Sequence, residues 1–261
     1  MQHIILVFFI LIVLLLILWG SVALGRRFGL KQIQKNGKHK LEVVGVAESA
    51  VFGLLGLLIA FTFSGAYERY ENRKFHILEE ANVFDTAYEM IDFVAPKYQP
   101  DLRRDVRQYL DLHLATYHDI PNMTAVGADM YKAIAVQHRI WHTIILANND
   151  DPNHAILQLV APAMSKMFEA FHSGINVSLI HPPPVIFLLL IGLAALGGFL
   201  VGYNVAESAE RNPVHVLCYV LLTAFIMYLI LNLEYPRVGF VKLTTFDQML
   251  VDVRQDMNYT N

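Results

Sequence analysis

The sequence predicts an all-α membrane protein in which four transmembrane helices carry a helical extramembrane insert between the second and the third. Of its 261 residues, 55% are hydrophobic and only 16% are charged, a composition more apolar than that of ordinary soluble domains. Four apolar runs reach the length of about 20 residues that a helix needs to cross the hydrocarbon core. A long, mostly polar stretch with helical spacing separates the second run from the third.

The first apolar run extends from Ile4 to Leu24 and contains no charged residue. The small residues Ser21 and Ala23 near its end resemble the cleavage site of a secretory signal peptide. A signal peptide, however, has basic residues before its apolar region, and the sequence Met-Gln-His contains no Lys or Arg. The flanking residues therefore favour a retained helix, and residues 1–42 are predicted to form this helix and a basic loop.

The other three membrane helices are predicted at residues 43–70, 185–203 and 214–233. The second contains an acid, Glu48, close enough to its start for the carboxylate to reach the membrane interface. The fourth contains Cys218, the only cysteine of the chain. A single cysteine forms no intrachain disulfide and no thiolate metal site, so Cys218 is interpreted as a small buried side chain.

The insert, residues 71–182, is predicted to be helical. Its apolar residues from Phe75 to Ile91 recur at helical spacing, so the second membrane helix is expected to continue out of the membrane as far as Pro96. Three further helices are expected, at residues 101–119, 128–147 and 154–174. Residues 43–261 are therefore interpreted as one domain rather than as separable modules.

The charge pattern bears on the orientation in the membrane. Six basic residues after the first helix are unopposed by any acid: Arg26, Arg27, Lys31, Lys35, Lys38 and Lys40. The positive-inside rule places such a short loop in the cytoplasm, which sends the insert to the other side. Basic residues at the end of the second helix favour the opposite orientation, so the side of the insert stays open, with the charge pattern favouring the non-cytoplasmic side.

Two membrane helices carry rows of small residues. On the second they recur every three or four positions and so share one helix face: Gly45, Ser49, Gly53, Gly56, Ala60 and Ser64. The third has a shorter row: Ala194, Gly198 and Gly202. Small residues let helices approach closely in lipid, where packing has to supply the attraction between them. The rows are predicted to be packing seams, either within the chain or, in part, towards a neighbouring subunit.

A row of larger residues, Leu55, Ile59 and Phe63, lies beside the small row of the second helix. In a symmetric ring of subunits, identical rows would meet at the axis and form a hydrophobic constriction that gates by dewetting. Apolar rows are also typical of any helix that faces lipid or a protein core. The pattern by itself leaves both interpretations open.

The end of the second helix resembles that of the bestrophin anion channels. The sequence Leu-Leu-Gly at residues 54–56 is followed by an apolar row and by AYERYENRK at residues 66–74, in which Tyr67, Arg69 and Tyr70 match the Tyr-x-Arg-aromatic segment of bestrophins. The later segments EEANVFDTAY and YPRVGF resemble a bestrophin-like bacterial family, a domain of largely undefined function. This resemblance covers most of the chain after Val43.

The resemblance implies a bestrophin-like fold and a homopentamer in the bacterial inner (plasma) membrane. The second helix of each subunit would line a central pore for small anions such as chloride, with Leu55, Ile59 and Phe63 as the constriction. The residues implied at the pore exit are Tyr67, Arg69, Tyr70, Arg73 and Lys74. Positive charge there would attract anions. The resemblance also places the insert in the cytoplasm, opposite to the side that the charge pattern favours.

Two alternatives stay open. The basic residues at the exit could mark the membrane interface and pair with Glu68, Glu71 and Glu79. The rival function is a non-conducting membrane scaffold or accessory protein, in which the seams and the insert serve assembly with partners. A channel needs the row of large residues to face the symmetry axis, whereas a scaffold does not.

Other function classes lack a candidate site. The net charge of −3 shows no excess of Lys and Arg of the kind that binds nucleic acid. His138 and His142 are four residues apart, but the first is not followed by the Glu of an HExxH signature. Asp85, Glu89 and Asp92 form an acidic stripe that is more typical of a solvated helix face than of a cation site. We predict no enzyme activity, metal or cofactor; the expected partners are copies of the chain, membrane lipid and small anions.

Overall fold

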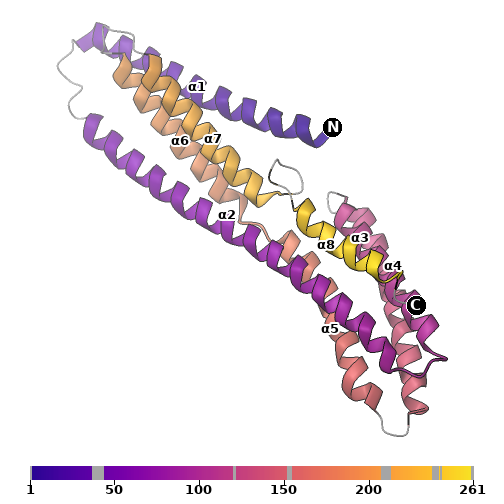
Figure 1. Cartoon of the computed structure of the whole chain (residues 1–261). Helices are drawn as coiled ribbons and strands as arrows, with labels where there is room; N and C mark the ends of the chain where they lie inside the picture. Colours follow the sequence, from indigo (N-terminus) through magenta and orange to yellow (C-terminus); the bar gives the residue numbers. More distant parts are fainter. Residues whose placement is uncertain are drawn as a thin grey trace. The chain divides into compact units, whose positions relative to one another are not determined.

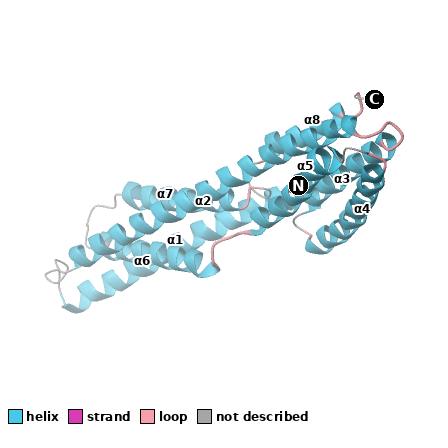
Figure 2. Cartoon of the chain, turned by 90° about the horizontal axis from the view of Figure 1, so that it is seen from below, coloured by secondary structure: helices cyan, strands magenta, loops and turns pink. Residues whose placement is uncertain are grey.

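The computed structural model describes residues 2–36, 44–119, 122–151, 155–206, 213–236, 241 and 243–259, and these residues form helices without any strand. The helices are α1 (Gln2–Asn36), α2 (Val44–Glu89), η2 (Met90–Phe93), α3 (Gln99–Asp119), α4 (Met123–Asn149), α5 (Ala155–Leu179), α6 (Pro184–Val205), α7 (Pro213–Glu234) and α8 (Thr244–Asp256). Figure 1 labels them along the chain, and Figure 2 shows the helical content from a second direction. The predicted all-α class is confirmed.

Contacts divide the chain into two compact units. The membrane unit contains Met1–Tyr70 and His181–Lys242, and the insert unit contains Glu71–Ile180 and Leu243–Asn261. Four helical stretches, in α1, α2, α6 and α7, are long and apolar enough to cross a membrane. The helix α2 contributes to both units, as the uninterrupted helical spacing through residues 70–91 indicated.

In the membrane unit, α1 and α6 pack most closely, because a glycine of each helix lies against the backbone of the other helix. A Cβ atom on Gly25 of α1 would lie 1.9 Å from the carbonyl oxygen of Phe199, and one on Gly202 of α6 would lie 2.0 Å from that of Val22. Ser21 donates a hydrogen bond to the carbonyl of Ala195 at the same contact. The small row of α6 is therefore a seam within the chain, and its partner row on α1 is one that the sequence analysis did not single out.

Several expectations for the membrane unit need correction. The first helix does not end at Leu24 but continues to Asn36, so four of the six basic residues lie on α1 rather than in a loop, while Lys38 and Lys40 lie outside the described residues. Cys218 is exposed on α7 rather than buried. A residue on the outer face of a membrane helix can be apolar because its surroundings are lipid.

The insert unit is built around aromatic rings from three helices. Phe84 of α2, Tyr109 of α3 and Phe171 of α5 are fully buried, with ring centroids 6.1 Å apart for Phe84–Tyr109 and 5.1 Å apart for Tyr109–Phe171. Burial raises the pKa of the Tyr109 phenol, whose hydroxyl has no hydrogen-bond partner among the described residues. Helices α3 and α4 pack as neighbours against this core.

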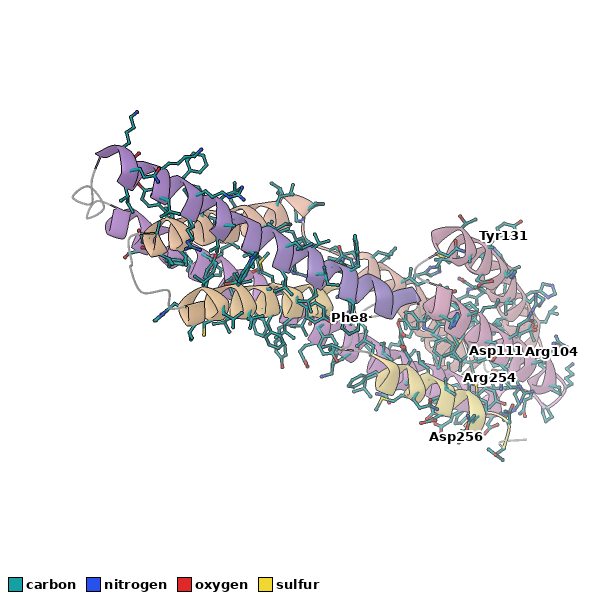
Figure 3. The ribbon with its side chains drawn as sticks, turned by 90° about the horizontal axis from the view of Figure 1, so that it is seen from above. Phe8, Arg104, Asp111, Tyr131, Arg254 and Asp256 are labelled. Carbon is teal, nitrogen blue, oxygen red and sulfur yellow. The ribbon has the colours of Figure 1, made fainter. Side chains whose placement is uncertain are left out.

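The expected helices of the insert are present with shifted ends, since α4 begins earlier, at Met123, and α5 continues past Gly174 to Leu179. The sequence analysis did not anticipate α8. Arg254 of α8 donates to both carboxylate oxygens of Asp111 on α3 at 2.7 and 3.0 Å, and Figure 3 shows the two residues close together. The carbonyl of Met257, just after α8, accepts hydrogen bonds from Tyr88 and Arg107.

Candidate functional site

The membrane part of α2 is covered by little of its own chain. Between Glu48 and Tyr70 only Leu55 and Ala66 are buried. On its inner side Glu48 accepts a hydrogen bond from Asn204 of α6, and Phe52 contacts Tyr219 of α7 edge to face with ring centroids 5.7 Å apart. On the opposite side of α2, Gly53, Gly56, Ala60, Phe63 and Ser64 are exposed within the described part of the membrane unit.

The small row lies on this uncovered side. A Cβ atom on Gly53 or Gly56 would meet nothing within 4 Å, and Ser49, Ala60 and Ser64 are exposed. Gly45 lies outside the residues whose surroundings are described. The row on α2 therefore differs from the row on α6. Among the described residues, Gly53, Gly56 and Ala60 of the first are exposed, whereas the second is packed against α1.

The row of large residues turns from the core to the surface. Leu55 is 4% exposed, Ile59 is partly buried against the same core, and Phe63 is 37% exposed. Residues four positions apart are rotated by about 40° around a helix of 3.6 residues per turn, so the row drifts across the surface. Phe63 stacks on the half-exposed ring of Tyr67, with centroids 6.5 Å apart, and these two aromatic side chains continue the row on the uncovered side.

Arg69, at the end of the membrane part of α2, is held by a buried carboxylate. Its Nε lies 2.9 and 3.1 Å from the two carboxylate oxygens of Glu234, and its Nη2 lies 2.8 Å from Oε2. The Glu234 side chain is fully buried at the end of α7, and Nδ1 of His181 lies 3.0 Å from Oε1. The carboxylate therefore compensates the Arg69 charge, as is usual for buried ionised groups.

The other basic residues of the exit motif belong to the insert unit and also have partners there. Arg73 is buried and donates to the carbonyl of Ile180 at 2.9 Å. Lys74 pairs with Glu71 at 2.9 Å, one of the acids expected as a partner. Tyr70, the last residue of the membrane unit before this point, is partly buried against its apolar core.

Glu234 and His181 are residues that the sequence analysis missed. Glu234 is the acid that directly follows the fourth apolar run, and His181 precedes the prolines before the third. An ionisable residue at the edge of a membrane helix is a signal for a functional or pairing role. The sequence gives no indication that these two residues meet Arg69, because that contact joins segments that are far apart in the chain.

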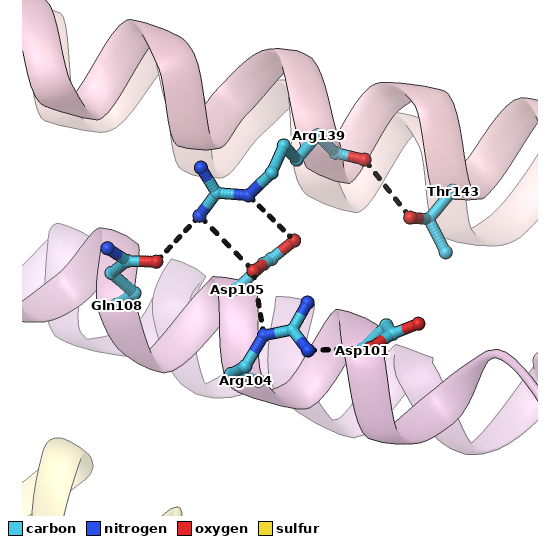
Figure 4. Close-up of polar contacts among 6 residues, drawn as sticks. All are labelled: Asp101, Arg104, Asp105, Gln108, Arg139 and Thr143. Carbon is cyan, nitrogen blue, oxygen red and sulfur yellow. Dashed lines mark hydrogen bonds and ion pairs between the residues drawn. The ribbon is translucent and has the colours of Figure 1, made fainter.

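The insert unit has a charged surface pocket between α3 and α4. It has a volume of about 300 Å³, and His138 and His142 line it. Arg139 donates to Asp105 and to Gln108, and Arg104 donates to Asp105 and Asp101 (Figure 4). The hydrogen bond with Asp105 raises the pKa of the Arg104 guanidinium.

Metal-ligating side chains do not gather in the described residues, which contain no cluster of three His, Cys, Asp or Glu that could hold an ion. In the acidic stripe, Asp85 and Glu89 are exposed, and Asp92 pairs with Arg103. The two histidines of the surface pocket have arginines beside them, which disfavour a cation at that position.

Comparison with known families decides what kind of membrane protein this is. A model of the bestrophin-like domain matches residues 12–245. The chain belongs to the bestrophin-like family. The match begins inside α1 and ends at the start of α8, so it takes in all four membrane helices and nearly all of the insert.

Solved structures of bacterial bestrophin homologues have a similar fold. One crystal structure of a bacterial bestrophin homologue from Klebsiella pneumoniae has 15% identity and a TM-score of 0.57, and covers 95% of this chain and 98% of its own. A second structure of such a homologue from this organism has 12% identity and a TM-score of 0.59, with the same coverage. A structure described as a membrane protein has 13% identity, a TM-score of 0.59 and 97% coverage of both chains. No curated protein sequence matches the chain.

Proposed function

We propose that this bestrophin-like protein is an oligomeric channel of the bacterial inner membrane that conducts small anions such as chloride through a central pore lined by α2. The proposal rests on the exposed face of α2. The family to which the chain belongs is named after the bestrophin channels, and this supports a role in conduction. Small and aromatic residues occupy this face, and none of the described helices of the membrane unit covers them. In a ring of subunits, here proposed to be five, such a face is shared between the neighbouring subunit and the pore.

The two kinds of side chain on this face have different proposed roles. Gly53, Gly56 and Ala60 allow the α2 helix of a neighbouring subunit to approach, since small residues drive close packing in lipid. Phe63, with Ile59 behind it, forms the apolar constriction at the axis. Leu55 is buried in its own unit, and the proposal therefore assigns the constriction to Ile59 and Phe63 alone.

Arg69 is proposed to stand at the exit as one half of an ion pair rather than as a free charge. Its Nε and Nη2 are held by Glu234, which fixes the guanidinium in one orientation. A charge-compensated arginine exerts only a weak pull on a passing anion and does not trap it, and conduction requires that an ion can also leave its site.

Replacing Phe63 by alanine is expected to increase chloride efflux from liposomes that contain the purified protein. The substitution removes an exposed aromatic side chain from the proposed constriction and so lowers the barrier that dewetting imposes. Efflux would be measured with a chloride electrode after addition of an ionophore that collapses the membrane potential. The matched control is Phe225→Ala, which removes an exposed phenylalanine from α7 and is expected to leave the efflux of the original protein unchanged.

The efflux experiment also separates the channel from a scaffold. If neither the original protein nor Phe63→Ala releases chloride, while both are oligomeric and correctly inserted, the channel proposal is wrong and the scaffold function is favoured. Equal efflux from the two proteins would show that the constriction lies elsewhere on α2.

Replacing Gly56 by leucine is expected to dissociate the oligomer while leaving each subunit folded. A Cβ atom at this position meets nothing within 4 Å among the described residues, so there is space for a larger side chain, which would block the approach of a neighbouring α2. Mass measured by light scattering would report assembly, and the thermal unfolding midpoint would report folding. Gly192→Leu is the control, because Gly192 on α6 is also open; a Gly56→Leu protein with the original mass would contradict the proposed subunit contact.

A further inference from the structure

A cavity of about 210 Å³ lies in the membrane unit between α2, α6 and α7. Its walls are apolar, formed by Leu58, Phe61, Ile186, Phe187 and Ile230, and Arg69 lies at its end. The hydroxyl of Thr62, which also lines it, already donates to the carbonyl of Leu58 at 2.7 Å. The cavity therefore combines an apolar groove with a cationic group at one end.

The groove has the length of one membrane leaflet. Leu58 and Arg69 mark its extent along α2, and a rise of 1.5 Å per residue separates them by about 16 Å. The hydrocarbon core of a bilayer is about 30 Å thick, so this distance is about half of it. Because Arg69 follows the apolar run of α2, its guanidinium lies where lipid headgroups begin.

Arg69 offers free donors on the side of the groove. Its Nε and Nη2 bind Glu234, whereas Nη1 lies beside Gly65, where a Cβ atom would be 3.2 Å away. Within the described residues Nη1 has no hydrogen-bond partner. Glycine at position 65, which also lines the groove, leaves room for a ligand atom to reach Nη1.

The charges around the groove favour an anion over a zwitterion. Glu234 is fully buried behind Arg69, and the described residues that line the groove include no carboxylate. A phosphate can therefore accept charge-assisted hydrogen bonds from Nη1. The ammonium of a choline or ethanolamine headgroup would find no exposed acid as a partner.

We propose that this groove binds one anionic phospholipid per subunit, with an acyl chain along Leu58, Ile186 and Ile230 and the phosphate on Nη1 of Arg69. The surrounding bilayer supplies this ligand. The length of the groove fits one leaflet, and Arg69 at its end favours an anionic headgroup. Since α2 forms one wall, bound lipid would fill the space between the proposed pore helix and α6. The lipid site does not depend on conduction, so it can be tested whether or not the protein is a channel.

The test counts bound lipids by native mass spectrometry on delipidated protein, after addition of dioleoylphosphatidylglycerol or dioleoylphosphatidylcholine. We expect one phosphatidylglycerol per subunit and weaker binding of phosphatidylcholine. Arg69→Gln is expected to weaken binding of phosphatidylglycerol about 10-fold, the loss of one charge-assisted hydrogen bond. Arg26→Gln, which removes an exposed arginine from α1, is expected to have no such effect.

A second variant keeps the proposal testable if Arg69→Gln does not fold. Ile186→Trp fills the groove but leaves Arg69 and Glu234 in place, and it is expected to lose the bound lipid; Leu222→Trp, at an exposed position of α7, is the control. Equal binding of both lipids, or unchanged binding in Ile186→Trp, would overturn the proposal. If Ile186→Trp instead dissociates the oligomer, a neighbouring subunit occupies the groove, and the lipid proposal is equally wrong.

Discussion

Replacing Gly202 by alanine is expected to destabilise the membrane unit by about 3 kcal/mol or more, because the added methyl group overpacks a rigid contact. The Cβ atom would lie 2.0 Å from the carbonyl oxygen of Val22, and backbone cannot rotate away as a side chain does. Helix α6 would therefore have to separate from α1 along the whole seam. Gly25→Ala is expected to have the same effect from the other helix, where the Cβ atom meets the carbonyl of Phe199 at 1.9 Å.

The sign of this effect distinguishes packing from helix propensity. Alanine is the better helix former by about 1 kcal/mol, so propensity alone predicts stabilisation at these positions. Gly20 on α1 and Gly192 on α6 are matched controls, because a Cβ atom at either position meets nothing within 4 Å. Thermal unfolding of the detergent-purified proteins would be compared; loss of stability in Gly20→Ala as large as in Gly25→Ala would contradict the close contact of α1 and α6.

Replacing Gly174 by alanine is expected to destabilise the insert unit by about 3 kcal/mol, by disrupting a buried polar cluster. Its Cβ atom would lie 1.7 Å from Oε1 of Glu80 and 2.4 Å from the hydroxyl of Tyr117. The Glu80 carboxylate is almost fully buried and accepts hydrogen bonds from Tyr117 at 2.7 and 2.8 Å, while Nε2 of His113 lies 3.0 Å from it. Glu80 could move only by giving up these partners inside the core.

The control for the Gly174→Ala substitution is made in the same unit, at another glycine. Gly127 of α4 is exposed and a Cβ atom there meets nothing, so Gly127→Ala is expected to be neutral or stabilising by up to about 1 kcal/mol. A destabilisation of 3 kcal/mol lowers the unfolding midpoint of a chain of this size by about 6–12 °C, which calorimetry resolves. A Gly174→Ala protein as stable as Gly127→Ala would show that the cluster tolerates an extra methyl group.

The membrane helices and the continuation of α2 were predictable because their signals are local. The length of an apolar run is set by the bilayer, and the expected third and fourth helices agree with α6 and α7 within about two residues. Helical spacing after Phe75 likewise predicted the rest of α2. The end of α1 was missed because the helix continues into charged sequence, where hydropathy no longer marks it.

The candidate site was predictable only in part. The sequence singled out α2 and its exit motif, but it placed Leu55 and Phe63 in one row, whereas packing buries the first and exposes the second. It left open that the basic residues pair with nearby acids, which holds for Lys74 and Glu71 but not for Arg69, whose partner is Glu234. Partners on other helices are set by tertiary contacts that leave no local pattern.

The sequence by itself determined the all-α membrane class, the number of membrane helices and the insert, because composition, run length and periodicity are properties of single segments. Its resemblance to the bestrophin-like family rested on short motifs at the end of the second helix and after it. Only the tertiary structure decided that one small-residue row, on α6, is packed against α1, whereas Gly53, Gly56 and Ala60 of the other, on α2, are exposed among the described residues. Both rows consist of small residues that recur every three or four positions. Their difference arises because packing depends on which helix supplies the opposite surface, and that choice is made by the whole fold.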